Sequence, residues 1–200
     1  MKIMARTKDE QLHAQRRDDI LQAAARTFKA KGFHSARTED ICAEAGLSAG
    51  TVFRHFGSKR EMIMEIAARE FARYQGEVRQ LASREGLEWL SQVDAAGLAA
   101  VLAPSDYDLG ADSWLELQRD PEWNEKVLTF DRDLRQTLTA ELERGQREGW
   151  VRASLDARGA TNLILAMFSG LGFDRDTGIE IDMQATATAM ADFCRVYIFA

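Results

Sequence analysis

The sequence predicts an all-α fold of about nine helices, and three observations support this. Apolar residues recur at spacings of three and four through most of the chain, which is the period of an amphipathic helix. No segment sustains the two-residue alternation that is typical of a half-buried strand. Only two prolines occur in 200 residues, Pro104 and Pro121, so long stretches can form uninterrupted helices.

Three short helices are expected first, each followed by a glycine, as is usual just past a helix end. They span residues 17–31, 37–44 and 49–55. The first carries an apolar stripe at helical spacing, made of Ile20, Leu21, Ala24 and Phe28. Three such helices form a compact trihelical unit.

Six further helices follow in the rest of the chain. They are expected over residues 58–82, 87–102, 111–118, 121–148, 156–171 and 182–199. Ser58 and Glu61 have the spacing of a capping box at the start of the first of these helices. Asp120 and Pro121 similarly predict a helix start, because a capping residue precedes a proline at the first helical position.

Charge divides the chain unevenly. The protein has a net charge of −6, yet residues 1–60 hold 12 Lys/Arg against 7 Asp/Glu, a balance of +5, which leaves −11 for the remainder. A basic head on an acidic body favours a phosphate-binding unit attached to a different module. We expect one domain over residues 1–62 and a second over residues 63–200.

The stretch from Asp40 to Phe56 carries the most informative pattern. Apolar anchors lie four residues apart in each of two helices, Ile41 and Ala45 and then Val52 and Phe56. Between them, Gly46 permits the left-handed backbone of a tight turn, Leu47 fills the angle between the helices, and Ser48 can cap the second helix. This pattern is typical of a helix-turn-helix, whose second helix enters the major groove of DNA.

The same region resembles the DNA-binding domain of the TetR family of bacterial regulators. The resemblance covers residues 15–67 and rests on an ordered set of short matches. These are Gly32-Phe33, Asp40-Ile41, Ala45-Gly46-Leu47-Ser48, Gly50-Thr51, His55-Phe56 and Ser58-Lys59. A looser similarity to the family's C-terminal half covers Gly145–Val151 and Ser169–Leu171.

The resemblance implies phosphate contacts by Thr51 and Lys59, while Ala49, Gly50 and Arg54 would face bases. Phe53 stands where the family usually has tyrosine, so it has no hydroxyl to donate to a phosphate. The expected DNA-binding residues are Arg37, Thr38, Ser48, Ala49, Gly50, Thr51, Phe53, Arg54, His55 and Lys59. For Arg54 and Lys59 the alternative is a solvated surface side chain. The basic residues Lys2, Arg6 and Lys8 belong either to a disordered tail or to an arm that reaches a minor groove.

The body is expected to form a dimer and to bind a small molecule, since the family does both. The expected interface residues are Leu163, Ala166, Ser169, Gly170, Met190, Phe193 and Tyr197. The expected ligand-binding residues are mainly aromatic and favour an apolar cavity: Trp89, Trp114, Phe130, Leu134, Met167 and Phe168. For both sets, the alternative is ordinary core packing within one chain.

The remaining features exclude other classes. The chain has no glycine-rich nucleotide loop, nucleophile elbow or zinc signature, so we expect no enzyme, metal or cofactor. Cys42 and Cys194 fit no ligand spacing and are expected to be buried core residues, with a redox role as the alternative. No apolar run is long enough to span a bilayer, and no secretory signal is recognisable, so we expect a cytoplasmic protein.

Together these patterns predict a ligand-responsive, dimeric transcriptional repressor that a small apolar effector releases from a palindromic operator. A DNA-binding regulator without an effector is the first alternative. A helical enzyme is the second and more remote one.

Overall fold

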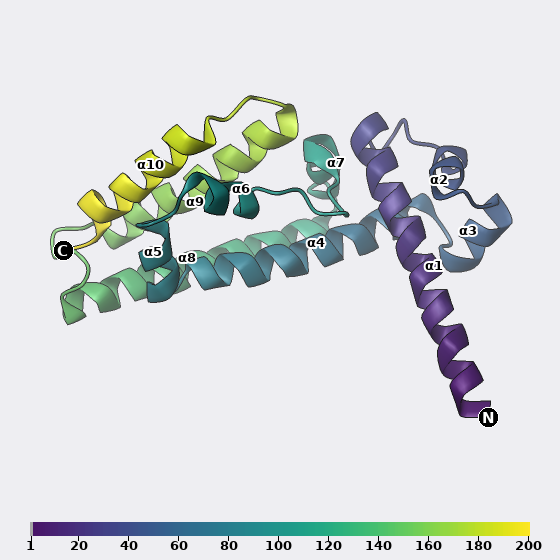
Figure 1. The fold of residues 1–200 in the computed structure, drawn as a ribbon, viewed down its shortest axis with the longest axis horizontal. Helices are drawn as coiled ribbons and strands as arrows, with labels where there is room; N and C mark the ends of the chain where they lie inside the picture. The colour runs from purple at the N-terminus through teal and green to yellow at the C-terminus, as the bar shows by residue number, and fades with distance from the viewer. Residues whose placement is uncertain (1) are drawn as a thin grey trace. The chain divides into compact units, whose positions relative to one another are not determined.

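The computed structural model describes the backbone of residues 2–200 and the side chains of residues 11–110 and 112–200 (Figure 1). The described residues form ten α-helices and one π-helical turn and contain no strand, which confirms the all-α prediction. The helices are α1 (Lys2–Lys31), α2 (Thr38–Ala45), α3 (Ala49–His55), α4 (Lys59–Leu81), α5 (Arg84–Leu90), α6 (Ala95–Val101), α7 (Gly110–Leu117), α8 (Pro121–Glu148), α9 (Ala157–Thr177) and α10 (Met183–Phe193). The π-helical turn spans Cys194–Ile198.

The first helix begins earlier than expected. We predicted a start near residue 17 after a disordered or groove-reaching tail, but α1 is helical from Lys2. No glycine or proline interrupts this segment, so nothing in the local sequence stops the helix. The side chains of Lys2, Arg6 and Lys8 lie outside the described residues, so a role of this basic segment in DNA binding stays a prediction.

Two other helix boundaries differ from the expectation. The helix predicted over residues 87–102 is two helices, α5 and α6, because Asp94 caps a new helix by accepting a hydrogen bond from the Gly97 amide at 2.7 Å. Helix α9 continues six residues beyond residue 171 and ends at Gly178, whose φ of 77° is the left-handed conformation common past a helix end.

The chain divides into two compact units. One comprises Met1–Ala72 and Pro104–Asp120, and the other comprises Arg73–Ala103 and Pro121–Ala200. Each unit thus draws on two separate parts of the sequence, and α4 contributes to both. The expected division between residues 62 and 63 stays a prediction about the domains.

The first unit, called the head below, is built around α1, α2 and α3. Its core consists of apolar side chains that are at most 2% exposed, among them Ile20, Leu21, Phe28, Ile41, Val52, Phe56, Met62 and Ile66. Tyr107 and Asp108 also tie the segment of residues 104–120 to the head. The Tyr107 hydroxyl donates to Asp18, which also accepts from Arg69 at 2.5 Å, and Lys29 pairs with Asp108 at 2.6 Å.

The second unit, called the body, is a helical bundle in which α8 packs on α9 and α10 packs on α6 (Figure 1). Buried leucines and isoleucines from four helices, α5, α6, α8 and α9, contribute to its core, among them Leu87, Leu98, Leu138, Leu142 and Ile164. The end of the chain is fixed by a backbone hydrogen bond from the Ala200 amide to the Trp150 carbonyl at 3.2 Å. No described helix combines the length and apolar character that crossing a bilayer requires.

Both cysteines are buried and unpaired with each other. Burial raises the pKa of the Cys194 thiol to about 11 and also raises the pKa of Cys42. A thiol of raised pKa forms little of the reactive thiolate at neutral pH, so both behave as small apolar core residues.

Candidate nucleic-acid interface

The turn between α2 and α3 is built from local hydrogen bonds. Gly46 ends α2 in the left-handed conformation, with φ of 64°, and the Leu47 amide donates back to the Cys42 carbonyl at 3.0 Å. Ser48 then caps α3, because its hydroxyl accepts from the Thr51 amide at 3.3 Å. The two helices are therefore set against each other by residues close together in the sequence.

Helix α3 has a buried side and an outward side. Val52 and Phe56 are 0% and 1% exposed and anchor the helix to the head. At about 100° per residue, Gly50 and Arg54 lie opposite these anchors and Phe53 lies to one side, while Ala49 lies beside Phe53 at the first residue of the helix. All four are exposed, and the Phe53 side chain keeps 52% of its surface in solvent. We call these four residues the outward face.

Thr51 and Arg54 lie close together at one side of this face. The Arg54 guanidinium donates to the Thr51 hydroxyl at 3.3 Å, and the same hydroxyl lies 3.0 Å from the Ser48 hydroxyl. Ser48, Thr51 and Arg54 therefore present polar hydrogen-bonding groups together. This arrangement suits contact with phosphate oxygens and base edges.

His55 ends the helix in a half-buried position. Its ring lies 4.4 Å from the ring of His13, and Arg17 donates a hydrogen bond to its carbonyl oxygen. Burial, followed by the nearby His13 and Arg17, lowers the pKa of His55 from its ordinary value. The imidazole is therefore neutral at neutral pH, and its Nδ1 atom is buried without a hydrogen-bond partner among the described residues.

Lys59, at the start of α4, is bound within the head. Its ammonium group donates to the carbonyl oxygens of Phe33 and Ala36 at 2.5 and 2.9 Å and lies 4.4 Å above the centroid of the Phe33 ring. Burial lowers the pKa of this ammonium group. Lys59 thus joins α4 to the loop between α1 and α2, and its expected phosphate contact stays a prediction.

The same loop leads to the start of α2, where Arg37 and Thr38 lie. Arg37 is exposed, and its backbone amide donates to the Asp40 carboxylate at 2.9 Å. The Lys31 side chain pairs with the same carboxylate at 2.7 Å, which together with the Arg37 amide lowers the pKa of Asp40. The beginning of α2 is therefore fixed on the surface of the head.

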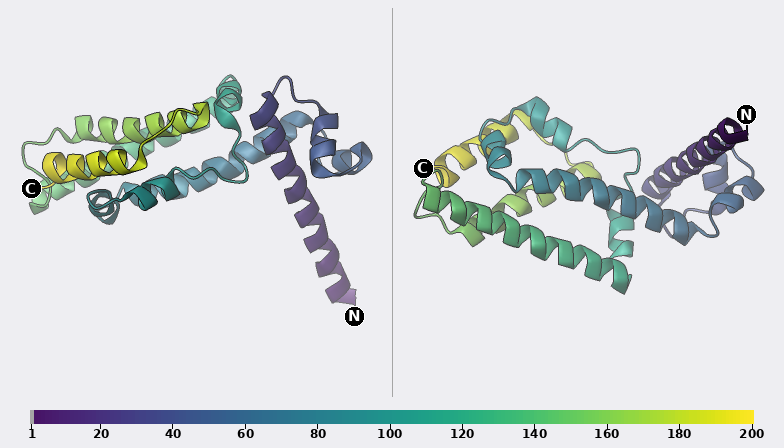
Figure 2. Two further views of the ribbon diagram at one scale, coloured as in Figure 1. Left: turned by 45° about the horizontal axis from the view of Figure 1, so that its top comes forward. Right: turned by 90° about the horizontal axis from the view of Figure 1, so that it is seen from below.

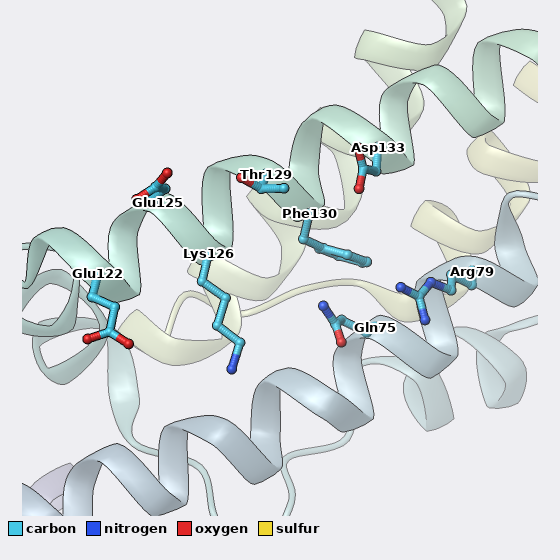
Figure 3. Close-up of a pocket in the computed structure, with 8 residues that line it drawn as sticks. All are labelled: Gln75, Arg79, Glu122, Glu125, Lys126, Thr129, Phe130 and Asp133. Atoms are coloured by element: carbon cyan, nitrogen blue, oxygen red, sulfur yellow. The ribbon is translucent and has the colours of Figure 1, made fainter.

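A cavity in the body can be compared with the expected ligand site. It has a volume of about 440 Å³ and lies between the second half of α4 and the first half of α8, which run side by side (Figure 2). Its lining residues are Gln75, Arg79, Glu122, Glu125, Lys126, Thr129, Phe130 and Asp133 (Figure 3). Seven of these eight side chains are polar or charged, whereas an apolar lining had been expected.

Of the six expected ligand-binding residues, only Phe130 lines this cavity. Trp114 belongs to α7 in the head, Trp89 is 38% exposed on α5, and Leu134 is buried in the core. Met167 and Phe168 are half-buried on α9. The polar lining residues were missed because on a long helix they have the same spacing as an ordinary solvated face.

The residues expected at a dimer interface also differ in exposure. Leu163 and Tyr197 are 45% and 44% exposed, and Ala166, Ser169 and Gly170 lie on the exposed side of α9. Phe193 is half-buried, whereas Met190 is 4% exposed and belongs to the core of its own chain. Two further exposed apolar residues were not anticipated, Phe173 and Val196, which are 56% and 67% exposed.

Comparison with known proteins places this geometry in a family. Residues 20–66 match the model of bacterial regulatory proteins of the tetR family, and residues 101–195 match the C-terminal model of BetI-type transcriptional repressors. The regulator UidR of Escherichia coli K12 is 27% identical over 171 residues, which cover 84% of this chain and 82% of UidR.

Solved structures share the fold. A putative transcriptional regulator from Saccharomonospora viridis, in complex with choline, is 25% identical, has a TM-score of 0.62, and covers 94% of this chain and 99% of its own. SmeT, the repressor of a Stenotrophomonas maltophilia multidrug efflux pump, is 20% identical with a TM-score of 0.64, over 92% of this chain and 90% of its own. The chain therefore belongs to the TetR family and is a DNA-binding transcriptional regulator, not an enzyme.

Proposed function

We propose that this regulator is a cytoplasmic, homodimeric repressor that binds a palindromic operator and is released from it by a small polar effector. The observation that carries the proposal is the outward face of α3. Ala49, Gly50, Phe53 and Arg54 are exposed together on a short helix that Val52 and Phe56 anchor to the head. Such a helix can enter a major groove of about 12 Å without disturbing the core beneath it.

The DNA contacts follow from the position of each residue. Arg54 would read a guanine through its O6 and N7 atoms, while Ser48 and Thr51 would hold phosphates beside it. Arg37 and Thr38 would bind a phosphate at the start of α2, where helix amides also favour an anion. His55 would pack at the edge of the interface. We assign Lys59 to positioning the α1–α2 loop, because two carbonyl oxygens already bind its ammonium group.

A dimer is proposed because one head offers too small a surface for tight and specific binding. The exposed side of α9 combines small residues with large apolar ones, and further apolar residues lie at the end of α10 and in the π-helical turn. This composition favours close helix packing. The proposed interface residues are Leu163, Ala166, Ser169, Gly170, Phe173, Phe193, Val196 and Tyr197. Two-fold pairing of this surface would present two heads to an inverted repeat.

The effector is proposed to be polar because of the lining of the cavity. Its volume of about 440 Å³ suits a small molecule, and three carboxylates line it together with Phe130. The Arg79 guanidinium lies 5.5 Å from the centroid of this ring, so the ring already attracts a cation. Choline is the first ligand to test, since a similar regulator has been solved with it.

Selection of bound duplexes from random DNA tests the proposal, using the full chain. We expect an inverted repeat to be enriched, with affinity that falls steeply as salt is raised. Choline added to the bound complex should release the DNA, and operator should weaken choline binding by the same factor. Enrichment of no sequence would refute operator recognition. Binding that no small molecule weakens would instead identify a regulator without an effector.

A further inference from the structure

We propose that the outward face of α3 reads thymine methyl groups through an apolar strip formed by Ala49 and Phe53. The proposal rests on the operator binding proposed above and names what this part of the helix recognises. It concerns base readout and does not involve the cavity in the body.

The strip follows from the geometry of the helix. Residues 49 and 53 are one turn apart, so their side chains lie next to each other on one side of α3. The anchors Val52 and Phe56 take the buried side, which leaves Phe53 with 52% of its surface in solvent. An aromatic ring so exposed contributes little to the core. In the sequence it lies between the core anchor Val52 and the basic residue Arg54.

Gly50 leaves the backbone uncovered beside this strip. A Cβ atom built on Gly50 would meet no atom within 4 Å, and its φ is not in the left-handed region. Neither the packing nor the backbone conformation of the head therefore requires a glycine at this position. Its absent side chain instead permits the helix to approach a groove closely enough for a methyl and a ring to touch base edges.

The chemistry of the strip selects the base. Neither Ala49 nor Phe53 can donate or accept a hydrogen bond, so neither can read the polar edges of guanine, cytosine or adenine. The C5-methyl group of thymine is the apolar feature of the major groove, and alanine and phenylalanine side chains contact it favourably. Because Arg54 is adjacent on the same face, we expect each half-site to contain a thymine close to a guanine.

Substitution of deoxyuridine for thymine tests this readout. The exchange removes the methyl group and leaves every hydrogen-bonding group of the base in place. Each thymine of the selected operator is replaced in turn, and the binding of the full-length protein is measured by fluorescence anisotropy. At one or two positions per half-site, we expect the affinity to fall about fourfold, the effect of one buried methyl group.

The variant Phe53→Ala should lose this sensitivity at the thymine that meets the ring, because its methyl group then has no ring to contact, and should keep it at a thymine that meets Ala49. Leu115→Ala is the matched control, since Leu115 is an apolar head residue that is 60% exposed on α7. It should keep the full response to deoxyuridine. A melting temperature close to that of the unmodified chain verifies that both variants fold.

Two results would overturn the inference. One is an operator whose affinity is unchanged by deoxyuridine at every thymine. The other is an effect of equal size at every thymine in the unmodified chain and in Phe53→Ala. In both cases the protein still binds its operator, so only the methyl readout is refuted. Failure to bind any selected duplex would refute the proposed function itself.

Discussion

The outward face of α3 and the start of α4 lie within twelve residues of each other, yet their charged side chains have different surroundings. Arg54 is exposed on α3 and donates a hydrogen bond to the neighbouring Thr51 hydroxyl. At the start of α4, Lys59 donates to two carbonyl oxygens, Glu61 accepts from the Gly57 amide at 2.7 Å, and Arg60 pairs with Asp120. The first region exposes its side chains to solvent, whereas the side chains of the second region bind other parts of the head.

Charge alone therefore does not identify a DNA contact in a basic head. We expect substitutions on the outward face of α3 to lower the affinity for DNA without lowering stability. Substitution of Lys59 at the start of α4 should instead lower stability and leave the affinity for DNA largely unchanged. The following changes test that separation, beginning with the largest expected effect.

Arg54→Ala should cause the largest loss. A bidentate contact to guanine contributes about 1–3 kcal/mol of discrimination, and a two-fold dimer would lose it at both half-sites. Binding to the operator should weaken, and the preference for one base should disappear in a repeated selection. The free energy of unfolding should change by less than about 0.5 kcal/mol, because the side chain is exposed. A destabilised head with unchanged base preference would contradict this separation.

Lys59→Met should act mainly on stability. The change removes two hydrogen bonds from a charged donor, so the free energy of unfolding should fall by about 2 kcal/mol in urea denaturation. Arg60→Met is the control, since it removes the same charge from a side chain that is 66% exposed and pairs with Asp120, and it should cost less than about 1 kcal/mol.

Salt dependence distinguishes the two roles of Lys59. If its ammonium group only positions the loop, the slope of log affinity against log salt should be the same in Lys59→Met as in the unmodified chain. A slope smaller by about 0.9 would instead mean that one phosphate contact has been lost. That result would restore the phosphate-binding role suggested by the sequence.

The smallest expected effect is the pH dependence that His55 gives to the free energy of unfolding. Its folded-state pKa is lowered by burial and by His13, Arg17, Arg54 and Arg16, so the unfolded chain takes up a proton more readily than the folded chain. The free energy of unfolding should therefore fall as the pH drops through the ordinary value of 6.5, down to the lowered pKa. His55→Gln removes this titration, and the stability difference between the two proteins should shrink with falling pH. A difference independent of pH would contradict the assignment.

The helix-turn-helix of the head could be predicted from the sequence because its contacts join residues close together in the chain. Ser48 caps α3 through Thr51, three residues away, and the anchors Val52 and Phe56 are one turn apart. These relations depend on the helical period alone. The carbonyl partners of Lys59 could not be predicted, since they lie 26 and 23 residues earlier in the chain.

The cavity and helix boundaries of the body were less predictable, and the cavity too depends on contacts between residues far apart in the chain. Which aromatic residue faces a cavity depends on how α4 and α8 pack, so a set of mainly aromatic residues included Phe130 but also residues that do not line the cavity. Trp114 was grouped with the body by its place in the sequence, although α7 packs on α1 in the head. The break between α5 and α6 was missed because Asp94 caps a helix without any glycine or proline before it.

The most direct test of the central claim is to place a negative charge on the outward face. Gly50→Glu puts a carboxylate where the structure leaves open space, and Gly76→Glu makes the same exchange at an equally open position of α4. Both variants should keep the melting temperature of the unmodified chain to within a few degrees, and only Gly50→Glu should lose operator binding, by about 100-fold or more. Operator affinity that survives Gly50→Glu, or is lost equally in Gly76→Glu, would show that α3 does not meet the DNA.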